Sequence, residues 1–323
     1  MKALPNNEIK QKPLKASRLY GDYLLMLAAP CALALIYYGP RVLAVIASGV
    51  LGAVLSDMLF CAVLRRNFLL KDLSNVFIGV VISLMLPAGI PLYVPAVAAV
   101  FAVSVAKIPF GGSIRTPFVP AAAGFAFISV CFKEQIFDYS YNSAEKMLGA
   151  RSLGALLLNG NSVRLNSINV FDILSGNVAG PMGAGCGLLM LACLVFLLVR
   201  RKGALFSPVS FIVTCALYAA VMPRVNASFS TSIFMELSAG SLLFAAVFLM
   251  SDYSTQPQKY STRILYGVLS GIFCMLMRTV GTYEETVCFA VLLANAFTPI
   301  IDPWFKKLTL KKKASSAREE AAK

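Results

Sequence analysis

Residues 41–63 read RVLAVIASGVLGAVLSDMLFCAV, an apolar run in which Asp57 is the one charged residue after the first position. A helix needs about 20 mostly apolar residues to cross the hydrocarbon core of a bilayer, and this run is long enough. A charged side chain in hydrocarbon is costly, so it normally pairs with another group or faces water. The stretch therefore predicts a transmembrane helix with a carboxylate inside it.

Nine further apolar stretches accompany this one along the chain. The ten predicted helices comprise residues 20–38, 41–63, 73–89, 91–107, 118–132, 182–199, 205–222, 236–251, 263–280 and 286–304. Hydrophobic residues make up 58% of the 323 residues and charged residues 14%, and the mean hydropathy is +0.75. A soluble domain of this composition would expose large apolar patches. The sequence thus predicts an all-α integral membrane protein with about ten transmembrane helices.

The basic residues favour one side of the membrane. If the first helix runs outward, all but seven of the 29 lysine and arginine residues fall on the inner side. The exceptions are Arg41, Lys133, Lys146, Arg151, Arg164, Arg224 and Arg278. Because positive loops remain in the cytoplasm, we expect a multi-pass protein of the cell membrane with both termini cytoplasmic. This topology explains the net charge of +14 without a nucleic-acid partner, since no basic face carries interleaved aromatic residues.

Two similar tripeptides indicate an internal duplication. Asp72-Leu73-Ser74 opens the predicted third helix, and Glu236-Leu237-Ser238 opens the eighth. Five helices separate equivalent positions, and an odd number of spans inverts the second copy relative to the first. We therefore expect two inverted five-helix halves. The predicted regions are a basic cytoplasmic tail (1–19), the first half (20–132), an extracytoplasmic loop too polar to be buried (133–181), the second half (182–304) and a second basic cytoplasmic tail (305–323).

The residue types limit metal and redox chemistry. Eight cysteines are scattered through the predicted helices without a C-x-x-C pair, and histidine is absent. We interpret the cysteines as small apolar core residues, because thiolate metal sites need clustered spacing. The lack of histidine excludes His-ligated haem, most zinc sites and the commonest general base. Electron transfer in this chain would therefore need an organic cofactor.

Carboxylates near or inside the predicted helices are candidates for an ion path. Asp57 lies about two turns before Arg65 and Arg66, so an ion pair with these arginines is the alternative to a role in ion movement. Asp252 and Asp302 lie near helix ends, where water can solvate them. A structural role is the alternative for each of these two.

Two glycine-rich segments interrupt the apolar pattern. Residues 107–117 read KIPFGGSIRTP, where Gly111 and Gly112 would let backbone amides approach a flat or anionic ligand. A tight turn between helices is the alternative interpretation. Residues 175–185 read SGNVAGPMGAG, a spacing that favours close helix packing.

Eight short motifs follow one another between about residues 18 and 307. They are Tyr38-Gly39-Pro40-Arg41, Leu70-Lys71-Asp72, Leu86-Pro87-Ala88-Gly89-Ile90-Pro91-Leu92, Phe110-Gly111-Gly112 with Phe118-Val119-Pro120-Ala121, Gly176-Asn177, Ser251-Asp252-Tyr253-Ser254-Thr255, Tyr283-Glu284-Glu285, and Asn295 through Asp302. Their order and spacing resemble the RnfD family, the D subunits of Rnf electron-transport complexes. That family is similar to NqrB, the B subunit of the sodium-translocating NADH:quinone oxidoreductase. The resemblance implies a component of a multi-subunit membrane complex rather than a stand-alone enzyme.

The resemblance also implies a flavin site, with one departure. The family carries FMN on the threonine of a Ser-Gly-Ala-Thr motif, and the matching stretch here is Leu148-Gly149-Ala150-Arg151-Ser152-Leu153. Arg151 has no hydroxyl to bear a phosphoester, so we expect FMN or riboflavin to be noncovalent or absent unless Ser152 substitutes. Arg151 could instead hold a free flavin phosphate by bidentate hydrogen bonds. By resemblance, Gly111 and Gly112 lie near a noncovalent flavin or quinone.

Two functions are compatible with these patterns. The first is the D subunit of an Rnf-type complex, which passes electrons through flavin and supports ion transport, with Asp57, Asp252 and Asp302 in the ion path. The second is a non-redox scaffold or small-solute permease that retains the fold. Bound flavin and copurifying redox subunits would favour the first. An independent enzyme is disfavoured, because no pairing of a nucleophile with a base is visible.

Overall fold

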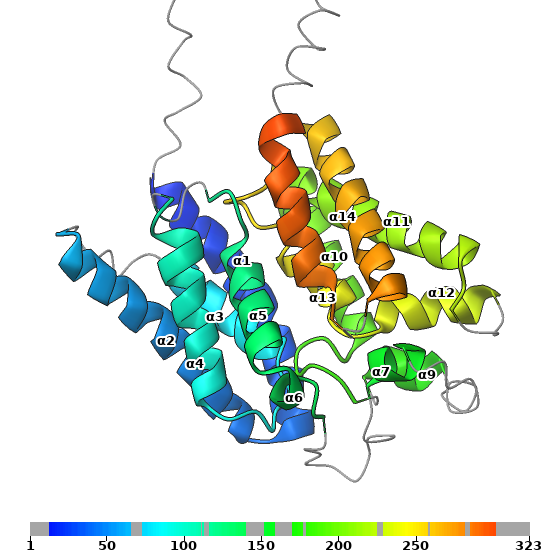
Figure 1. Cartoon of the computed structure of the whole chain (residues 1–323), viewed down its shortest axis with the longest axis horizontal. Helices are drawn as coiled ribbons and strands as arrows, with labels where there is room; N and C mark the ends of the chain where they lie inside the picture. Colours follow the sequence, from blue (N-terminus) through cyan, green and yellow to red (C-terminus); the bar gives the residue numbers. More distant parts are fainter. Residues whose placement is uncertain are drawn as a thin grey trace, which may run out of the picture.

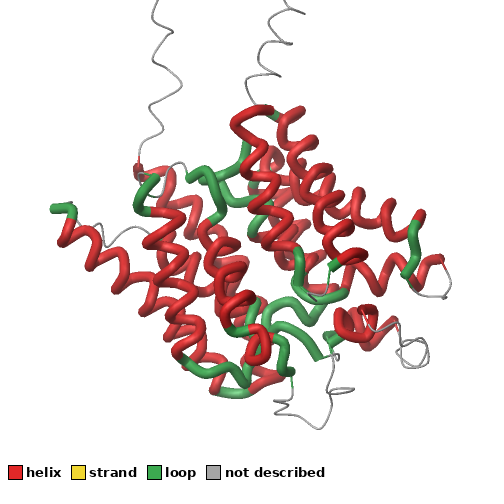
Figure 2. Tube along the Cα trace, in the orientation of Figure 1, coloured by secondary structure: helices red, strands yellow, loops and turns green. Residues whose placement is uncertain are grey.

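The computed structural model describes residues 13–65, 73–110, 112, 116–139, 152–158, 170–176, 179–224, 229–257, 259–281 and 285–301. The first half consists of α1 (Pro13–Tyr38), α2 (Arg41–Val63), α3 (Ser74–Leu84), α4 (Tyr93–Phe101), the π-helix η2 (Ala102–Lys107) that continues α4, and α5 (Pro120–Cys131). Three short helices follow, namely α6 (Lys133–Ile136), α7 (Leu153–Leu158) and α9 (Val170–Ser175). Within the described ranges there is no strand, as the all-α prediction expects (Figure 2).

The second half also contains both long and short helices. It consists of α10 (Gly187–Arg200), the 3-10 helix η3 (Lys202–Leu205), α11 (Phe206–Val221), α12 (Phe229–Ser238), α13 (Leu242–Phe248), α14 (Tyr260–Val280) and a last helix, Val287–Ile301. The helices of the first half lie together on one side of the molecule, and α10 to the last helix lie on the other (Figure 1). One apolar core extends through both groups, from Leu27 of α1 to Phe248 of α13 and Ala290 of the last helix.

Length and composition support a multi-pass membrane protein. Four apolar segments, Leu19–Tyr38, Arg41–Val63, Gly203–Val221 and Tyr260–Val280, are long enough to cross a bilayer, and five shorter apolar helices accompany them. On α2, the leucines at positions 51, 55 and 59 are between 58% and 64% exposed. Such a row of exposed apolar side chains suits contact with lipid.

Tight glycine contacts explain how the short third helix fits into its half. A Cβ added to Gly79 of α3 would lie 2.6 Å from Cα and 2.7 Å from N of Val50 on α2. These are backbone atoms, which cannot move aside as a flexible side chain can. Gly79 therefore allows α2 and α3 to approach more closely than any larger residue would, as small residues do in packed membrane helices.

The predicted continuous helix 236–251 is wrong. The structure ends α12 at Ser238 and starts α13 at Leu242, with Gly240 between them at a φ of 62°. This left-handed backbone favours glycine. The Ser241 amide donates a hydrogen bond to Glu285 Oε1 at 2.7 Å, so a carboxylate stabilises the start of α13. An apolar pattern alone does not reveal such a break.

The prediction that the loop 133–181 is too polar to be buried is also wrong for part of it. Leu153, Leu156 and Leu157 of α7 are buried in a small second core with Ile173 of α9, Met235 of α12 and Ala239 just after α12. This leucine-rich segment packs against α12 and buries apolar surface there (Figure 1).

Candidate functional site

A chain of polar side chains joins three helices of the first half, at the start of α3 and the end of η2. Lys107 Nζ, at the end of η2, donates hydrogen bonds to Ser74 Oγ at 2.6 Å and to Asn75 Oδ1. Asn75 Nδ2 in turn donates to Asp57 Oδ2 at 2.8 Å. Lys107 and Asn75 are each 2% exposed, so this is a buried ammonium linked through an amide to a carboxylate. Buried charges of this kind persist only where polar partners are supplied.

The π-helix determines where Lys107 lies. Its six residues, Ala102–Lys107, end with a hydrogen bond from the Ile108 amide to the Val103 carbonyl at 3.0 Å, the wider spacing of a π-helix. The extra residue per turn rotates the end of this helix relative to a regular α-helix. Such π-helical turns occur frequently at functional sites.

A second polar group surrounds Asp252 in the segment that connects α13 and α14. Asp252 Oδ1 accepts hydrogen bonds from Tyr20 Oη of α1 at 3.4 Å and from the Ser254 amide at 3.2 Å. Thr116 Oγ1 contacts Ser254 Oγ at 3.1 Å, and Tyr23 Oη donates to the Ser251 carbonyl. Burial raises the pKa of Asp252 to about 6, although Ser254, Tyr20 and the charge of Lys107 oppose the rise. This segment thus connects the second half to α1 and to the loop before α5.

One cation acts on Asp252, and another lies beside Tyr23, which bonds to Ser251. The charge of Lys107 acts on Asp252 from η2, and Arg201, just after α10, lies 4.9 Å from the ring centroid of Tyr23. We name Asp57, Asn75, Lys107, Tyr20 and Asp252 the inner cluster. Its members come from α1, α2, α3, η2 and the α13–α14 connection. The Tyr20–Asp252 hydrogen bond therefore connects the two halves, whereas Asp57, Asn75 and Lys107 contact one another within the first half.

A hydroxyl without a hydrogen bond lies close to this cluster. Tyr266 of α14 is 1% exposed, and no hydrogen-bond partner for its Oη lies within the described part of the chain. The Asp252 charge is near enough to act on it. Buried hydroxyls usually find a partner, so this group can accept or donate one further bond inside the cluster.

The predicted ion-path residues have different outcomes. Asp57 and Asp252 both lie within reach of Lys107, one through Asn75 and one through its charge. The hydrogen bond described for Asp57 comes from Asn75, not from Arg65, which was the alternative partner near its own helix. Asp302 lies outside the described residues. Whether any of them carries an ion stays a prediction.

The predicted flavin residues are described only in part. Gly111, Gly149, Ala150 and Arg151 lie outside the described residues. Gly112 has a φ of 96°, which suits glycine, and a Cβ there would meet open space. Ser152 is 2% exposed, and its Oγ accepts a hydrogen bond from the Ala155 amide at 3.0 Å at the start of α7. The Ser152 hydroxyl is therefore a helix cap in this structure.

Three residues of the inner cluster, Tyr20, Asn75 and Lys107, are not predicted as site residues. The charge of Lys107 indicates an inner loop, and the residue type of Asn75 does not by itself single it out in the sequence. The available signal was their position, since Asn75 follows the tripeptide 72–74 that opens the third helix and Lys107 ends the fourth. Two polar residues at adjoining helix ends are expected to meet if the helices pack side by side.

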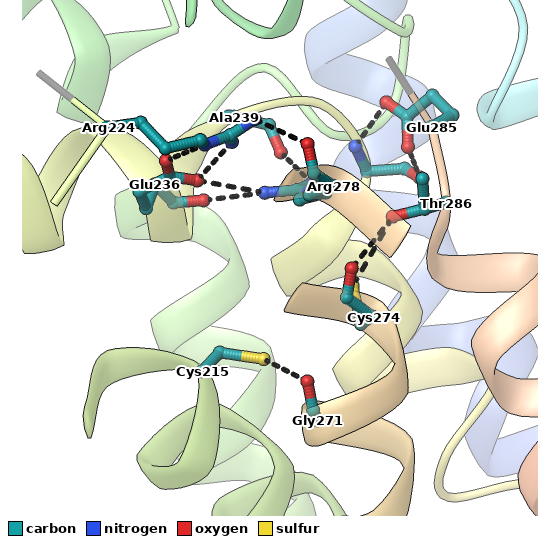
Figure 3. A network of polar contacts seen from close by, with 10 residues as sticks. Cys215, Arg224, Glu236, Ala239, Gly271, Cys274, Arg278, Glu285 and Thr286 are labelled. Carbon is teal, nitrogen blue, oxygen red and sulfur yellow. Dashed lines mark hydrogen bonds and ion pairs between the residues drawn. The ribbon is translucent and has the colours of Figure 1, made fainter. Parts of the chain in front are cut away.

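A second buried charge network, which we name the outer cluster, lies in the second half. It is at the end of α14 that is far from the α13–α14 connection. It consists of Arg224, Glu236, Arg278 and Glu285 (Figure 3). Arg224 holds Glu236 with two hydrogen bonds, Nε to Oε1 at 2.5 Å and Nη2 to Oε2 at 2.6 Å. Arg278 lies 3.7 Å from Glu236 Oε2 and donates to the carbonyls of Glu236 and Ala239 at 2.9 and 2.8 Å. Glu236, Arg278 and Glu285 are each 2% exposed.

The outer cluster changes one interpretation made from the sequence. Glu284 and Glu285 follow Arg278 closely in the sequence, which by itself indicates simple counter-charges for the arginine. The Glu285 carboxylate instead accepts hydrogen bonds from the Ser241 amide at 2.7 Å and from the Ser241 hydroxyl at 2.5 Å. Glu236 forms the ion pair with Arg278. The cluster thus fastens α11, α12 and α14 to each other and to the start of α13.

Comparison with known proteins places these features in context. Residues 9–311 match the family model described as NQR2, RnfD, RnfE. The D subunit of a proton-translocating ferredoxin:NAD(+) oxidoreductase complex from Clostridium ljungdahlii is 27% identical over 294 residues, covering 88% of this chain and 89% of the relative. The D subunit of a Na(+)-translocating ferredoxin:NAD(+) oxidoreductase complex from Acetobacterium woodii is 25% identical over 300 residues, covering 93% of this chain and 92% of the relative. The B subunit of a Na(+)-translocating NADH-quinone reductase from Chromohalobacter salexigens is 29% identical over 241 residues, covering 73% of this chain and 59% of the relative.

Proposed function

The chain belongs to the NQR2, RnfD, RnfE family, and from this membership we propose that it is the D-type membrane subunit of an ion-translocating oxidoreductase complex. The observation that carries the proposal is the extent of the match, which includes every described helix. The two ferredoxin:NAD(+) oxidoreductase relatives align over about nine-tenths of their own length. A chain that had kept only one module of the family would match over part of that length.

The proposed topology places both termini in the cytoplasm. The charge bias of the loops supports it, because 22 of the 29 lysine and arginine residues then lie on the inner side. The inner cluster would lie toward the cytoplasmic face, and the outer cluster toward the opposite face. Each cluster lies at the ends of short helices, where an ion could enter or leave the protein interior.

For the cofactor, we propose that this chain carries no flavin bound through a phosphoester. Position 151 offers a guanidinium rather than a hydroxyl. Its neighbour Ser152 is buried, and its oxygen caps α7, so a phosphoester there would need the start of that helix to open. Flavin held without a covalent bond remains compatible with the proposal, and Arg151 is the residue suited to a flavin phosphate.

The ion side of the function rests on the inner cluster. Asp57 and Asp252 are carboxylates inside or beside transmembrane helices, and intramembrane carboxylates commonly mark ion paths. Asp252 lies where the two halves meet, which is the usual position for substrate sites in transporters built from inverted repeats. We propose that a cation passes through the first half beside Asp57 and reaches Asp252.

The experiment is purification of the tagged chain from its native membrane under mild conditions. Copurification of redox subunits, together with ion uptake by vesicles during electron transfer, is expected. Intact mass should equal that of the unmodified chain, and flavin should be released on denaturation or be absent. A chain that purifies without redox subunits and leaves membrane electron transfer unchanged when deleted would refute the proposal. It would favour the scaffold or permease, an interpretation to which Arg151 lends weight.

A further inference from the structure

We propose that the start of α1 is a gate for the ion path, which opens and closes the way between Asp252 and the protein surface. The gate consists of the contacts that Asp22 and Tyr23 make with the end of α10 and with the α13–α14 connection. This inference rests on the proposed function, since it assumes that the complex moves an ion. Asp22 and Tyr23 are positioning residues here, because they control access to Asp252 rather than bind the ion within the protein.

The contacts of the gate form layers between the surface and Asp252. Arg200 Nη2 lies 3.3 Å from Asp22 Oδ1, and these two side chains are 55% and 33% exposed. The Arg201 side chain is 13% exposed, and its guanidinium lies 4.9 Å from the ring centroid of Tyr23. Tyr23 is 1% exposed, and its Oη donates to the carbonyl of the residue that precedes Asp252. Exposure therefore falls step by step from the Asp22–Arg200 pair to the buried carboxylate.

Several of these contacts are weak enough to break and re-form. Ion pairs between exposed side chains contribute little to stability and are screened by salt. The hydrogen bond from Tyr20 Oη to Asp252 Oδ1, at 3.4 Å, is longer than usual for two oxygen atoms. Arg201 Nη2 lies 3.9 Å from Asp22 Oδ2, and it is buried without a hydrogen bond to the described residues. Buried polar atoms normally have a partner, so the closed gate leaves a group unsatisfied that water would reach in the open gate.

A second contact between the two halves is of a different kind. It joins the end of α3 to the residues that lead into α10. The Met182 amide donates to the Leu86 carbonyl at 3.0 Å, and the Gly183 amide donates to the Leu84 carbonyl at 2.7 Å. A Cβ at Gly183 would lie 2.6 Å from Cβ of Leu84, so the two segments are in direct contact. Buried main-chain hydrogen bonds are costly to leave unmade, so we expect this contact to stay closed and to act as the hinge.

The charges at the gate differ between its two states. In the closed state, Arg200 and Arg201 lie beside Asp22, and their positive charges oppose the approach of a cation. When α1 separates from α10, the Asp22 carboxylate loses both arginines and can attract a cation from water. The same movement takes the two tyrosines of α1 away from Asp252 and from the residue before it. Opening therefore attracts the ion and uncovers Asp252 in one step.

The test links the gate shut in the intact complex, reconstituted into vesicles. Asp22→Cys and Arg200→Cys are combined, and a short bifunctional methanethiosulfonate reagent joins the two thiols. A direct disulfide would instead need the two Cα atoms within about 7 Å of each other. Uptake of Na⁺ and of protons is measured during electron transfer. Linkage should slow the uptake of the transported ion at least about tenfold, because the gate can no longer open, and a reductant that cleaves the linker should restore it.

The matched control is a pair of cysteines within the first half, Tyr93→Cys with Gln135→Cys. Tyr93 Oη donates to Gln135 Oε1 at 3.1 Å at an exposed position, so the same reagent can join these two sites. This linkage does not connect the halves, and uptake should stay within about twofold of the untreated sample. Wild type treated with the reagent controls for the native cysteines, of which Cys131 is exposed.

The outcomes separate this inference from the function on which it rests. If wild-type vesicles move an ion and the linked gate, with its linkage proved by mass, moves it equally fast, the gate is wrong and the function stands. If the control linkage blocks uptake as strongly as the gate linkage, the gate is also wrong. If wild-type vesicles transfer electrons and move no ion, the proposed function itself fails.

Amide hydrogen exchange of the wild-type complex decides if the gate variant does not assemble. Peptides that cover residues 250–256, beside the gate, should exchange at least about tenfold faster than peptides that cover residues 181–185, at the hinge, because local opening exposes the first group only. Equal exchange in the two segments, or faster exchange at the hinge, would overturn the inference.

Discussion

Replacing Arg278 by methionine should strongly destabilise the second half. The side chain is 2% exposed and donates to the carbonyls of Glu236 and Ala239 at 2.9 and 2.8 Å. Methionine fills similar space without a donor, so both carbonyl oxygens would lose a hydrogen bond inside the protein. Glu236 would keep its two bonds from Arg224, and its carboxylate would not be left without a partner.

The magnitude follows from these contacts. A buried acceptor left without its donor costs about 1–3 kcal/mol, so two carbonyls amount to roughly 2–6 kcal/mol. In a chain of this size, about 2 °C of melting temperature is lost for each kcal/mol. We therefore expect the apparent Tm of the detergent-solubilised protein to fall by roughly 4–12 °C.

The assay is thermal unfolding of the purified chain, followed by size-exclusion chromatography after heating. Arg200→Met is the matched control, because Arg200 pairs with Asp22 at 3.3 Å but its side chain is 55% exposed. Exposed ion pairs contribute about 0–1 kcal/mol, so this variant should stay within about 2 °C of wild type. Equal Tm values for the two variants would refute the view that the outer cluster fastens the second half.

Three further changes test other parts of the structure. Asp252→Asn should abolish ion uptake. Wild-type uptake should fall as the pH drops below about 6, because the raised pKa of Asp252 leaves its carboxyl group protonated there and unable to attract a cation. Uptake that stays constant from pH 7 to pH 5 would contradict this. Gly79→Ala should lower the apparent Tm by several degrees, since the alanine Cβ would meet the Val50 backbone at 2.6 Å. An unchanged Tm would mean that α2 and α3 pack less tightly than this structure shows. Arg41→Met should lower the free energy of unfolding by about 1–3 kcal/mol, because the guanidinium donates to the carbonyls of residues 88–90. In the same unfolding assay, Arg41→Lys should recover part of this loss.

The helices were predictable because apolar length is a direct consequence of bilayer thickness. The run 41–63 coincides with α2, and the run 263–280 lies within α14. The break in 236–251 was missed because the apolar pattern continues through it, and the turn at Gly240 depends on Glu285, which lies far along the chain. Hydropathy is local, whereas the stability of that turn comes from a distant carboxylate.

The candidate site was predicted only in part, for a related reason. Asp57 and Asp252 stand out because carboxylates are rare in apolar sequence. Lys107 does not stand out, since a lysine at the inner end of a helix is typical of an inner loop. Only the π-helical end and the packing of α3 against α4 bring it next to Asn75. Partners so far apart in sequence cannot be paired from one chain alone.

The turn between α12 and α13 restricts how this chain can diverge. At Gly240, a Cβ would overlap the Glu285 carboxylate, and the backbone there is left-handed. A mutation at codon 240 would therefore be tolerated only after a shorter residue had arisen at codon 285. That first step would leave Ser241 without its acceptor. The two positions should change together or not at all among homologues, so Gly240 and Glu285 can serve as a paired marker for this break in more distant sequences.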